Sequence, residues 1–315
     1  MECPKPKSKV LRRISFENDE TMSKRDVGRA NYFLGTKYQK YVRVHGMQPE
    51  EKPKEVTEQK PEEKLIPKKF YAFGLLVIFI AVYVQYVVPL GRILGFVVVY
   101  GIPVLVVSFL AGKQILKKAN KNNVVATKYG LGLFGIFTLA SIFLSIIVLI
   151  ILVFFNPQTI SLLEKPNPVL QVPPSLALVM TVVSLLIVGP AEEYLFRGFV
   201  YGGLLNMFKG QHWISLAFIS SLVFAAVHLY YALTYGAASI IPFIDIVTFG
   251  MAMAMTYYLS GGNIVIPALI HGVYDATGFF AVATNLVYGV LLRVVLIVIG
   301  VVFAAIYIRQ KTFKM

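Results

Sequence analysis

The chain has 315 residues, of which 57% are hydrophobic and only 15% charged, and its mean hydropathy is +0.69. Ordinary soluble domains carry about 25% charged residues, so this composition argues against a soluble globular protein and predicts an integral membrane protein. The single cysteine, Cys3, excludes an intrachain disulfide.

Residues 1–69 form a hydrophilic segment with 17 of the 30 Lys and Arg and 11 of the 16 Asp and Glu. From about residue 48 this segment is charged, interrupted by prolines and too poor in apolar residues to bury a core. We therefore expect a largely disordered cytoplasmic arm at 1–69 and a membrane domain at 70–315, without a cleaved signal peptide. The arm could contact anionic lipid headgroups, but a solvated tail is the favoured interpretation. No nucleic-acid partner is expected.

Apolar runs long enough to cross about 30 Å of hydrocarbon follow one another from residue 70 onward. They predict an all-α, polytopic bundle of about eight transmembrane helices. The fourth run is expected to continue to about residue 208. The predicted spans are 70–89, 93–112, 129–155, 174–195, 213–232, 240–259, 263–282 and 286–308.

Basic residues between the spans predict the orientation of the bundle, because cytoplasmic loops carry an excess of Lys and Arg. With eight spans, both termini fall on one side together with three basic segments, and the loops on the other side are nearly free of charge. We therefore expect both termini to be cytoplasmic. The residues concerned are Lys113, Lys117, Lys118, Lys121, Lys128, Lys209, Arg309, Lys311 and Lys314.

Ionisable residues within the spans are the candidates for function, because a charge in hydrocarbon is costly and usually faces a protein interior. Only five acidic residues occur after residue 70, and two of them are the neighbours Glu192 and Glu193. Their side chains are rotated by about 100 degrees on a helix, so they cannot share one partner equally. Glu193 and Arg197 lie one turn apart and are expected to form an ion pair with a structural role.

Later spans hold further candidates for the same site. His271 and Asp275 share a helix face, and His228 lies in the fifth span. A single membrane histidine is commonly a hydrogen-bonding residue between helices, although two histidines with a surplus acid weaken that interpretation. Asp245 is expected to be a polar residue near a helix end. Pro190 is expected to weaken or kink the fourth helix.

Three segments together resemble the motifs of a known family. EEYLFRG at 192–198, FAAVH at 224–228 and HGVYD at 271–275 are similar to EExxxR, FxxxH and HxxxN or HxxxD of the CAAX prenyl protease and bacteriocin-processing (CPBP, or Abi) family of intramembrane endopeptidases. The similarity covers roughly 174–282, and the eight-span layout is also similar to that of the CAAX-processing type II proteases.

The resemblance implies peptide-bond hydrolysis of a membrane-associated, sometimes prenylated, substrate. Glu192 would be the general base, His228 would orient the water, and His271 and Asp275 would stabilise the oxyanion. Because an ionised Asp275 would repel an oxyanion, it is either protonated, or fixes the tautomer of His271, or binds a metal. Metal-independent catalysis is favoured, with no cofactor. A zinc ion held by Glu192, His228, His271 and Asp275 is the alternative.

Two other functions remain open from the residues alone. A transporter or proton relay would use the same buried groups, but it would typically show inverted repeats, which are not evident here. A noncatalytic membrane scaffold or immunity protein would keep the helices and lose the chemistry, yet every motif position is occupied. Counting helix rise also puts Glu192 nearer the inner membrane edge than His228, which the longer fourth helix is expected to resolve.

Overall fold

The computed structural model describes residues 67–88 and 90–312, which belong to a compact unit at Lys64–Met315. Within these residues there are helices and turns and no strands, so the predicted all-α fold is confirmed. Nearly all of the predicted arm at 1–69, with its expected disorder, lies outside the described residues.

The helices follow the predicted spans within a few residues at most boundaries, because the apolar runs are long and the polar breaks are short. Several spans combine α-helical and wider π-helical turns. The elements in chain order are α2 (Lys68–Val87), α3 (Arg92–Phe96), η2 (Val97–Gly101), α4 (Ile102–Leu116), α5 (Asn123–Phe155), α6 (Thr159–Leu163), η3 (Pro168–Leu170), α7 (Pro174–Val183), η4 (Ser184–Val188), α8 (Gly189–Glu193), η5 (Tyr194–Tyr201), α9 (Gly202–Met207), α10 (Trp213–Ala226), α11 (Tyr230–Tyr235), η6 (Gly236–Ser239), α12 (Ile240–Leu259), α13 (Val265–Ala283) and α14 (Leu286–Thr312).

Seven helices in the described part of the chain are long and apolar enough to cross a membrane. The fourth runs without a break from Pro174 to Met207, as predicted. The predicted span 213–232 differs, because α10 has only 14 residues and is followed by a turn. In this turn the His228 N–H donates to Ala225 O, while His228 Nδ1 donates to Phe224 O at 2.8 Å. In a continuing α-helix the His228 N–H would donate to Phe224 O. The His228 side chain occupies this carbonyl instead, and the helix ends here.

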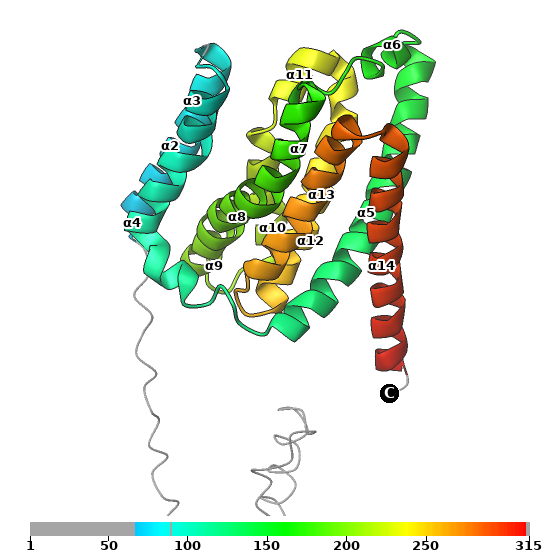
Figure 1. The fold of residues 1–315 in the computed structure, drawn as a ribbon. Coiled ribbons are helices and arrows are strands. Elements are labelled where there is room, and N and C mark those ends of the chain that lie inside the picture. Colours follow the sequence, from blue (N-terminus) through cyan, green and yellow to red (C-terminus); the bar gives the residue numbers. More distant parts are fainter. Residues whose placement is uncertain (1–66, 89, 313–315) are drawn as a thin grey trace, which may run out of the picture. The chain divides into compact units, whose positions relative to one another are not determined.

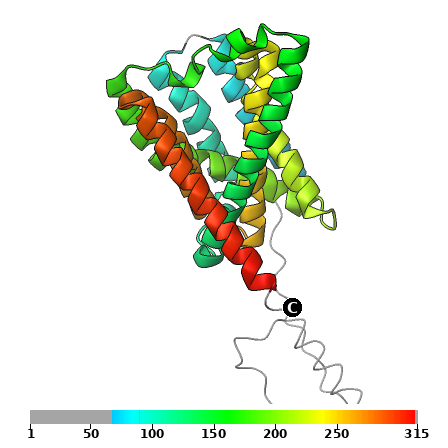
Figure 2. The same cartoon turned by 90° about the vertical axis from the view of Figure 1, so that its right-hand side faces the viewer.

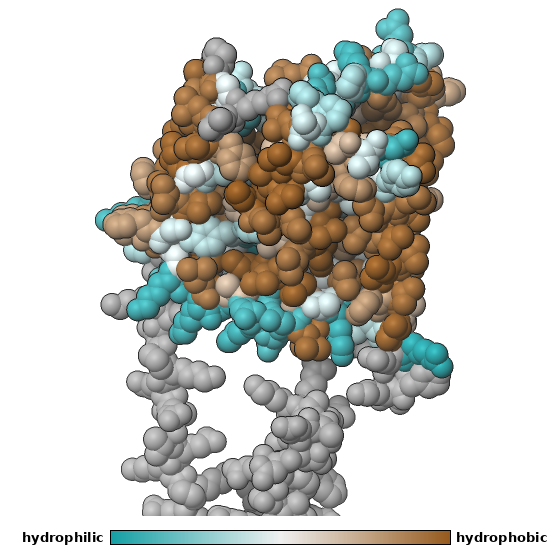
Figure 3. Space-filling view, in the orientation of Figure 1, coloured by the Kyte–Doolittle hydropathy of each residue, from teal (hydrophilic) through white to brown (hydrophobic). Residues whose placement is uncertain are grey.

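The outer surface of the bundle is apolar. Phe109 is 92% exposed, Leu233 84% and Phe154 80%, values that a water-soluble domain would rarely combine. Figure 3 shows a broad hydrophobic band with hydrophilic residues gathered at the two ends of the helices. The chain is an integral membrane protein, and this band is the surface that contacts lipid.

The basic loops lie at one end of the helices. The turn from α4 to α5, the end of α9 and the C-terminal end of α14 share this end, whereas α6 and α11 lie at the other (Figure 1). Lys117, Lys121 and Lys209 belong to the first end, and Glu164 with Lys165 to the second. The basic segments therefore lie at the same end of the helices, as the charge pattern predicts. The cytoplasmic location of the termini stays a prediction.

The helix packing brings the fourth span against α13. α5 packs on α12 and on α14, which crosses the bundle in Figure 2, and α13 contacts α7, η4 and α8. Gly189 and Gly272 make the last contact unusually close. A Cβ at Gly189 would lie 2.6 Å from Gly272 N, and one at Gly272 would lie 2.8 Å from Leu185 Cα. Two glycines therefore let the backbones touch, one turn or less from Glu192 and His271.

Candidate active site

Glu192 and Glu193 lie in a short α-helical stretch, α8, between two π-helical segments. The preceding segment, η4, closes with the Gly189 N–H donating to Ser184 O. Pro190 lacks an N–H, so the wider turn accommodates it and the helix continues. The predicted weakening at Pro190 therefore takes the form of a π-helical turn. Both carboxylates are buried, Glu193 completely and Glu192 with 8% exposure.

His271 is the centre of the polar cluster and contacts three carboxylates. Its Nδ1 lies 2.7 Å from Glu193 Oε1, and its Nε2 lies 3.4 Å from both Glu192 Oε2 and Asp275 Oδ2. The neighbouring glutamates thus contact the same imidazole through different nitrogens and at unequal distances. The structure brings three sequence-predicted residues, Glu192, His271 and Asp275, into one cluster.

Glu193 has a second function besides the predicted ion pair. Its Oε1 lies 3.0 Å from Arg197 Nη1, an ion-pair distance, and also accepts from His271 Nδ1. Because a carboxylate accepts, His271 Nδ1 must carry a hydrogen. The residue that fixes the histidine tautomer is therefore Glu193, a contact that sequence spacing did not indicate. Asp275 instead faces the other nitrogen.

Arg197 is held on three sides and is 1% exposed. It pairs with Glu193, donates from Nη2 to Gly250 O at 3.4 Å, and places its guanidinium 4.5 Å from the Phe224 ring centroid. Breaking a buried ion pair by removing one partner costs about 3–5 kcal/mol. The structural ion pair expected from the sequence is present, and it anchors the site to α10 and α12.

His228 joins the site through aromatic contacts. Its ring centroid lies 4.8 Å from that of Phe224, which lies 5.8 Å from that of His271. His228 also interacts electrostatically with Glu192 and His271. Since the Phe224 carbonyl can only accept, His228 Nδ1 carries a hydrogen, and in the neutral ring Nε2 keeps its lone pair. The residue lies in the turn after α10 and not inside a helix as predicted.

Asp275 is the most solvent-accessible member of the cluster. Its side chain is 32% exposed, against 4% for that of His271 and 10% for that of Glu192. Asp275 and His271 are one turn apart on α13, so the open side of the cluster is the Asp275 side.

Tyr100 is a site neighbour that the motifs do not include. It lies in η2 of the second span, and its hydroxyl donates to Glu192 Oε1 at 2.8 Å. The only sequence signal was a tyrosine within an apolar run ahead of glycine and proline, which is too weak to identify a contact.

A second polar cluster surrounds Asp245, which was predicted to lie near a helix end. Asp245 is the sixth residue of α12, which begins at Ile240 after Gly236 (φ 53) ends α11, so it lies near the start of that helix as predicted. Asp245 accepts from Ser141 at 3.1 Å and from Tyr274 at 2.8 Å. Tyr274 stacks on Phe249, whose ring centroid is 4.8 Å from that of His271. This cluster packs behind the site.

The donor set gives little support for a resident metal. Within the described residues, no group of three or more His, Cys, Asp or Glu side chains is arranged to hold a metal ion. His271 Nδ1 is bonded to Glu193 and His228 Nδ1 to Phe224, so only the two Nε2 atoms could be ligands. A zinc ion held by Glu192, His228, His271 and Asp275 stays an untested alternative.

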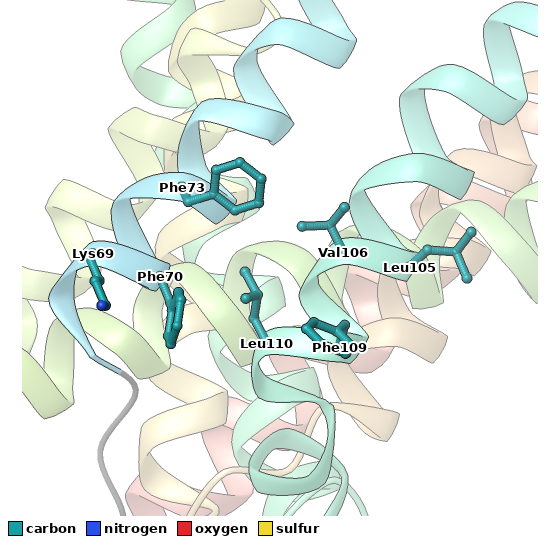
Figure 4. A pocket seen from close by; sticks show the side chains of 7 residues that line it. All are labelled: Lys69, Phe70, Phe73, Leu105, Val106, Phe109 and Leu110. Carbon is teal, nitrogen blue, oxygen red and sulfur yellow. The ribbon is translucent and has the colours of Figure 1, made fainter.

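An apolar groove between α2 and α4 is separate from this cluster. Figure 4 shows Phe70 and Phe73 on α2 opposite Val106 and Leu110 on α4. One charged residue, Lys69, lies at its edge, and none of the polar cluster residues lines it, so the groove is part of the lipid-facing surface. Its lining residues are Lys69, Phe70, Phe73, Leu105, Val106, Phe109 and Leu110.

A comparison with protein families gives one match. Residues 174–277 match the family described as "Type II CAAX prenyl endopeptidase Rce1-like". The matched third of the chain contains Glu192, His228, His271 and Asp275, so the resemblance drawn from the three motifs is confirmed. Comparison with curated proteins and with solved structures gives no significant match.

Proposed function

We propose that this protein is an intramembrane endopeptidase that hydrolyses a peptide bond near the C-terminus of a prenylated, CAAX-type protein. The observation that carries the proposal is the convergence of Glu192, His271 and Asp275, with His228 close by, within a segment matching type II CAAX prenyl endopeptidases. A lipid-facing surface around this cluster suits a membrane-bound substrate. Membrane lipids are the other partners that we infer.

Glu192 is the proposed general base. It takes a proton from a water molecule while the water oxygen adds to the carbonyl carbon of the scissile bond. Glu192 then passes this proton to the leaving nitrogen as the C–N bond breaks, so that one water is added across the peptide bond. Positioned general bases contribute about 10²–10⁴-fold to rate. His228 orients the water, because the Nε2 lone pair is free to accept its hydrogen bond.

His271 is the proposed oxyanion donor. With Nδ1–H bonded to Glu193, the ring donates from Nε2 only if it is protonated, and three surrounding carboxylates favour the imidazolium electrostatically. This arrangement removes the difficulty of an ionised Asp275, because the positive ring lies beside it. Preorganised donors of this kind contribute about 2.7–4 kcal/mol to transition-state stabilisation.

The test uses the purified full-length chain in liposomes, with a prenylated C-terminal peptide and its unprenylated counterpart as substrates. We expect cleavage of the prenylated peptide, and a loss of at least about 10²-fold in kcat for Glu192→Gln. The matched control is Glu164→Gln, because Glu164 is exposed at the end of the helices opposite the basic segments. This variant should cleave the peptide at the wild-type rate. We also expect wild-type activity to survive exhaustive chelation.

Several outcomes would contradict parts of this proposal. Full activity in Glu192→Gln would remove the assigned base. Uptake of solute into the liposomes without cleavage would favour the transporter. Stoichiometric zinc that is lost in His228→Ala, with activity lost on chelation, would replace the metal-independent mechanism. Equal cleavage of both peptides would leave a peptidase without selectivity for the prenyl group.

A further inference from the structure

We infer that Tyr100, which lies outside the segment matched by the family, is a positioning residue for Glu192. Its hydroxyl donates to Glu192 Oε1 at 2.8 Å, an ordinary length for an O–H···O hydrogen bond. The inference rests on the proposed function, because it assigns Tyr100 a role through the general base.

The tyrosine reaches the site because its helix is locally widened. In η2 the Ile102 N–H donates to Val97 O, which is one residue farther than in an α-helix. Pro103 follows and lacks an N–H, so the preceding turn can widen without losing a bond there. π-helical turns of this kind change the direction of the side chains they carry. Tyr100 is the only residue of η2 with a polar side chain.

Aromatic neighbours hold the ring. Phe96 lies one turn earlier, with its ring centroid 4.9 Å from that of Tyr100. Tyr86 and Tyr230 stack on each other, with their ring centroids 5.2 Å apart, and both lie in the neighbourhood of Tyr100. The hydroxyl is thus carried by a ring with little freedom, in contrast to the long side chain of Glu192.

The two carboxylate oxygens of Glu192 have different neighbours. Oε1 accepts from Tyr100, and Oε2 lies 3.4 Å from His271 Nε2. Together these contacts fix the plane of the carboxylate, with one anchor from the second span and the other from α13. Without the tyrosine hydroxyl, rotation about the terminal torsion of Glu192 would be restrained only at Oε2. The Glu192 carboxylate would then leave its productive orientation. Misplacement of a catalytic group lowers kcat more than it weakens substrate binding.

The experiment compares Tyr100→Phe with wild type in the liposome assay, measuring kcat and KM separately. Removing the hydroxyl keeps the ring contacts, so we expect the thermal unfolding midpoint to be unchanged. We expect kcat to fall about tenfold, equivalent to about 1.4 kcal/mol, with KM within about twofold. Incorporation of 3-fluorotyrosine at position 100, which retains a hydroxyl donor, should preserve at least about half of kcat.

Tyr83→Phe is the matched control, because it deletes the same hydroxyl from a residue that is 69% exposed to lipid. Its kcat should equal that of wild type. A wild-type kcat for Tyr100→Phe would overturn the positioning role while the proposed function stands, as long as Glu192→Gln is inactive. If Tyr100→Phe lowers both kcat and the thermal unfolding midpoint, Tyr100 has a structural role instead. Absence of cleavage by wild type would overturn both proposals.

Discussion

At the scale of single residues, the polar cluster separates into buried anchors and an accessible edge. Glu193 and Arg197 are buried with each other and with His271, so they fix one side of the imidazole. Asp275 lies on the other side and is one third exposed. The two carboxylates that flank His271 therefore have different tasks. The inner one sets the ring position, and the outer one lies at the accessible edge of the cluster.

The first prediction concerns Asp275. Asp275→Asn keeps a carbonyl oxygen beside His271 Nε2 and should retain activity within about fivefold, whereas Asp275→Ala removes the acceptor and should lose at least about tenfold in kcat. The reason is that Glu192 and Glu193 still favour the His271 imidazolium in Asp275→Asn, so the lost charge costs less than the loss of the acceptor beside Nε2. The measurement is kcat for both variants in the liposome assay.

Equal losses in the two Asp275 variants would show instead that the negative charge itself is required. The unfolding midpoint serves as the control, because a partly exposed carboxylate at the edge of the cluster should contribute little to stability. A large drop in the midpoint of Asp275→Asn would contradict the assigned role.

Sequence reasoning identified the members of the cluster but not all of their contacts. The motif residues are polar groups inside apolar helices, and the cost of burying such groups makes them visible in a sequence. The contact from Glu193 to His271 depends on how α8 and α13 pack, and no spacing rule encodes it. Tyr100 was missed because an aromatic residue in an apolar span usually serves packing alone.

At the scale of elements, the position of His271 depends on the contact between α13 and the fourth span. Gly272 follows His271 directly, and its Cα side packs on the backbone of Leu185 and Ser184. Helix boundaries could be predicted because they follow apolar runs. Apolar runs do not predict features that arise from tertiary packing or from side chains competing for backbone hydrogen bonds. These features are the close glycine contact, the π-helical turns and the early end of α10.

The second prediction tests this contact. Gly272→Ala would place a Cβ 2.8 Å from Leu185 Cα and 2.9 Å from Ser184 O, so the helices must separate. Overpacking of this kind costs about 1–3 kcal/mol, and a shift of His271 from Glu192 should lower kcat at least about tenfold. Activity and the thermal unfolding midpoint are measured together.

Gly95→Ala is the control for a glycine change in a membrane helix. Its Cβ would lie 3.9 Å from the nearest side-chain atom, which is ordinary contact, so activity and stability should stay at wild-type values. Wild-type kcat in Gly272→Ala would mean that the close approach of the two helices does not position the histidine.

At the scale of the whole chain, charge and hydropathy define a membrane protein with one basic end. The Lys-rich turn from α4 to α5, Lys209 and the end of α14 are together, and the opposite end carries Glu164 and Lys165. Because positive loops stay on the cytoplasmic side, this arrangement predicts cytoplasmic termini.

The third prediction concerns this orientation. In a chain with Cys3→Ser, single cysteines are introduced by Lys117→Cys and by Glu164→Cys at opposite ends of the helices. In intact cells, a membrane-impermeant maleimide should label the Glu164→Cys chain and not the Lys117→Cys chain. After permeabilisation, both should be labelled. The reverse pattern in intact cells would place the basic end outside.

The histidine at the centre of the cluster also has a consequence for biosynthesis. Its partners Glu192 and Glu193 leave the ribosome almost 80 residues before His271, and Tyr100 leaves earlier still. A nascent chain therefore holds two acids and Arg197 in its fourth span without the imidazole that completes them. The polar cluster can therefore form only after α13 has been made and has entered the bilayer, so the proposed peptidase activity would begin late in synthesis.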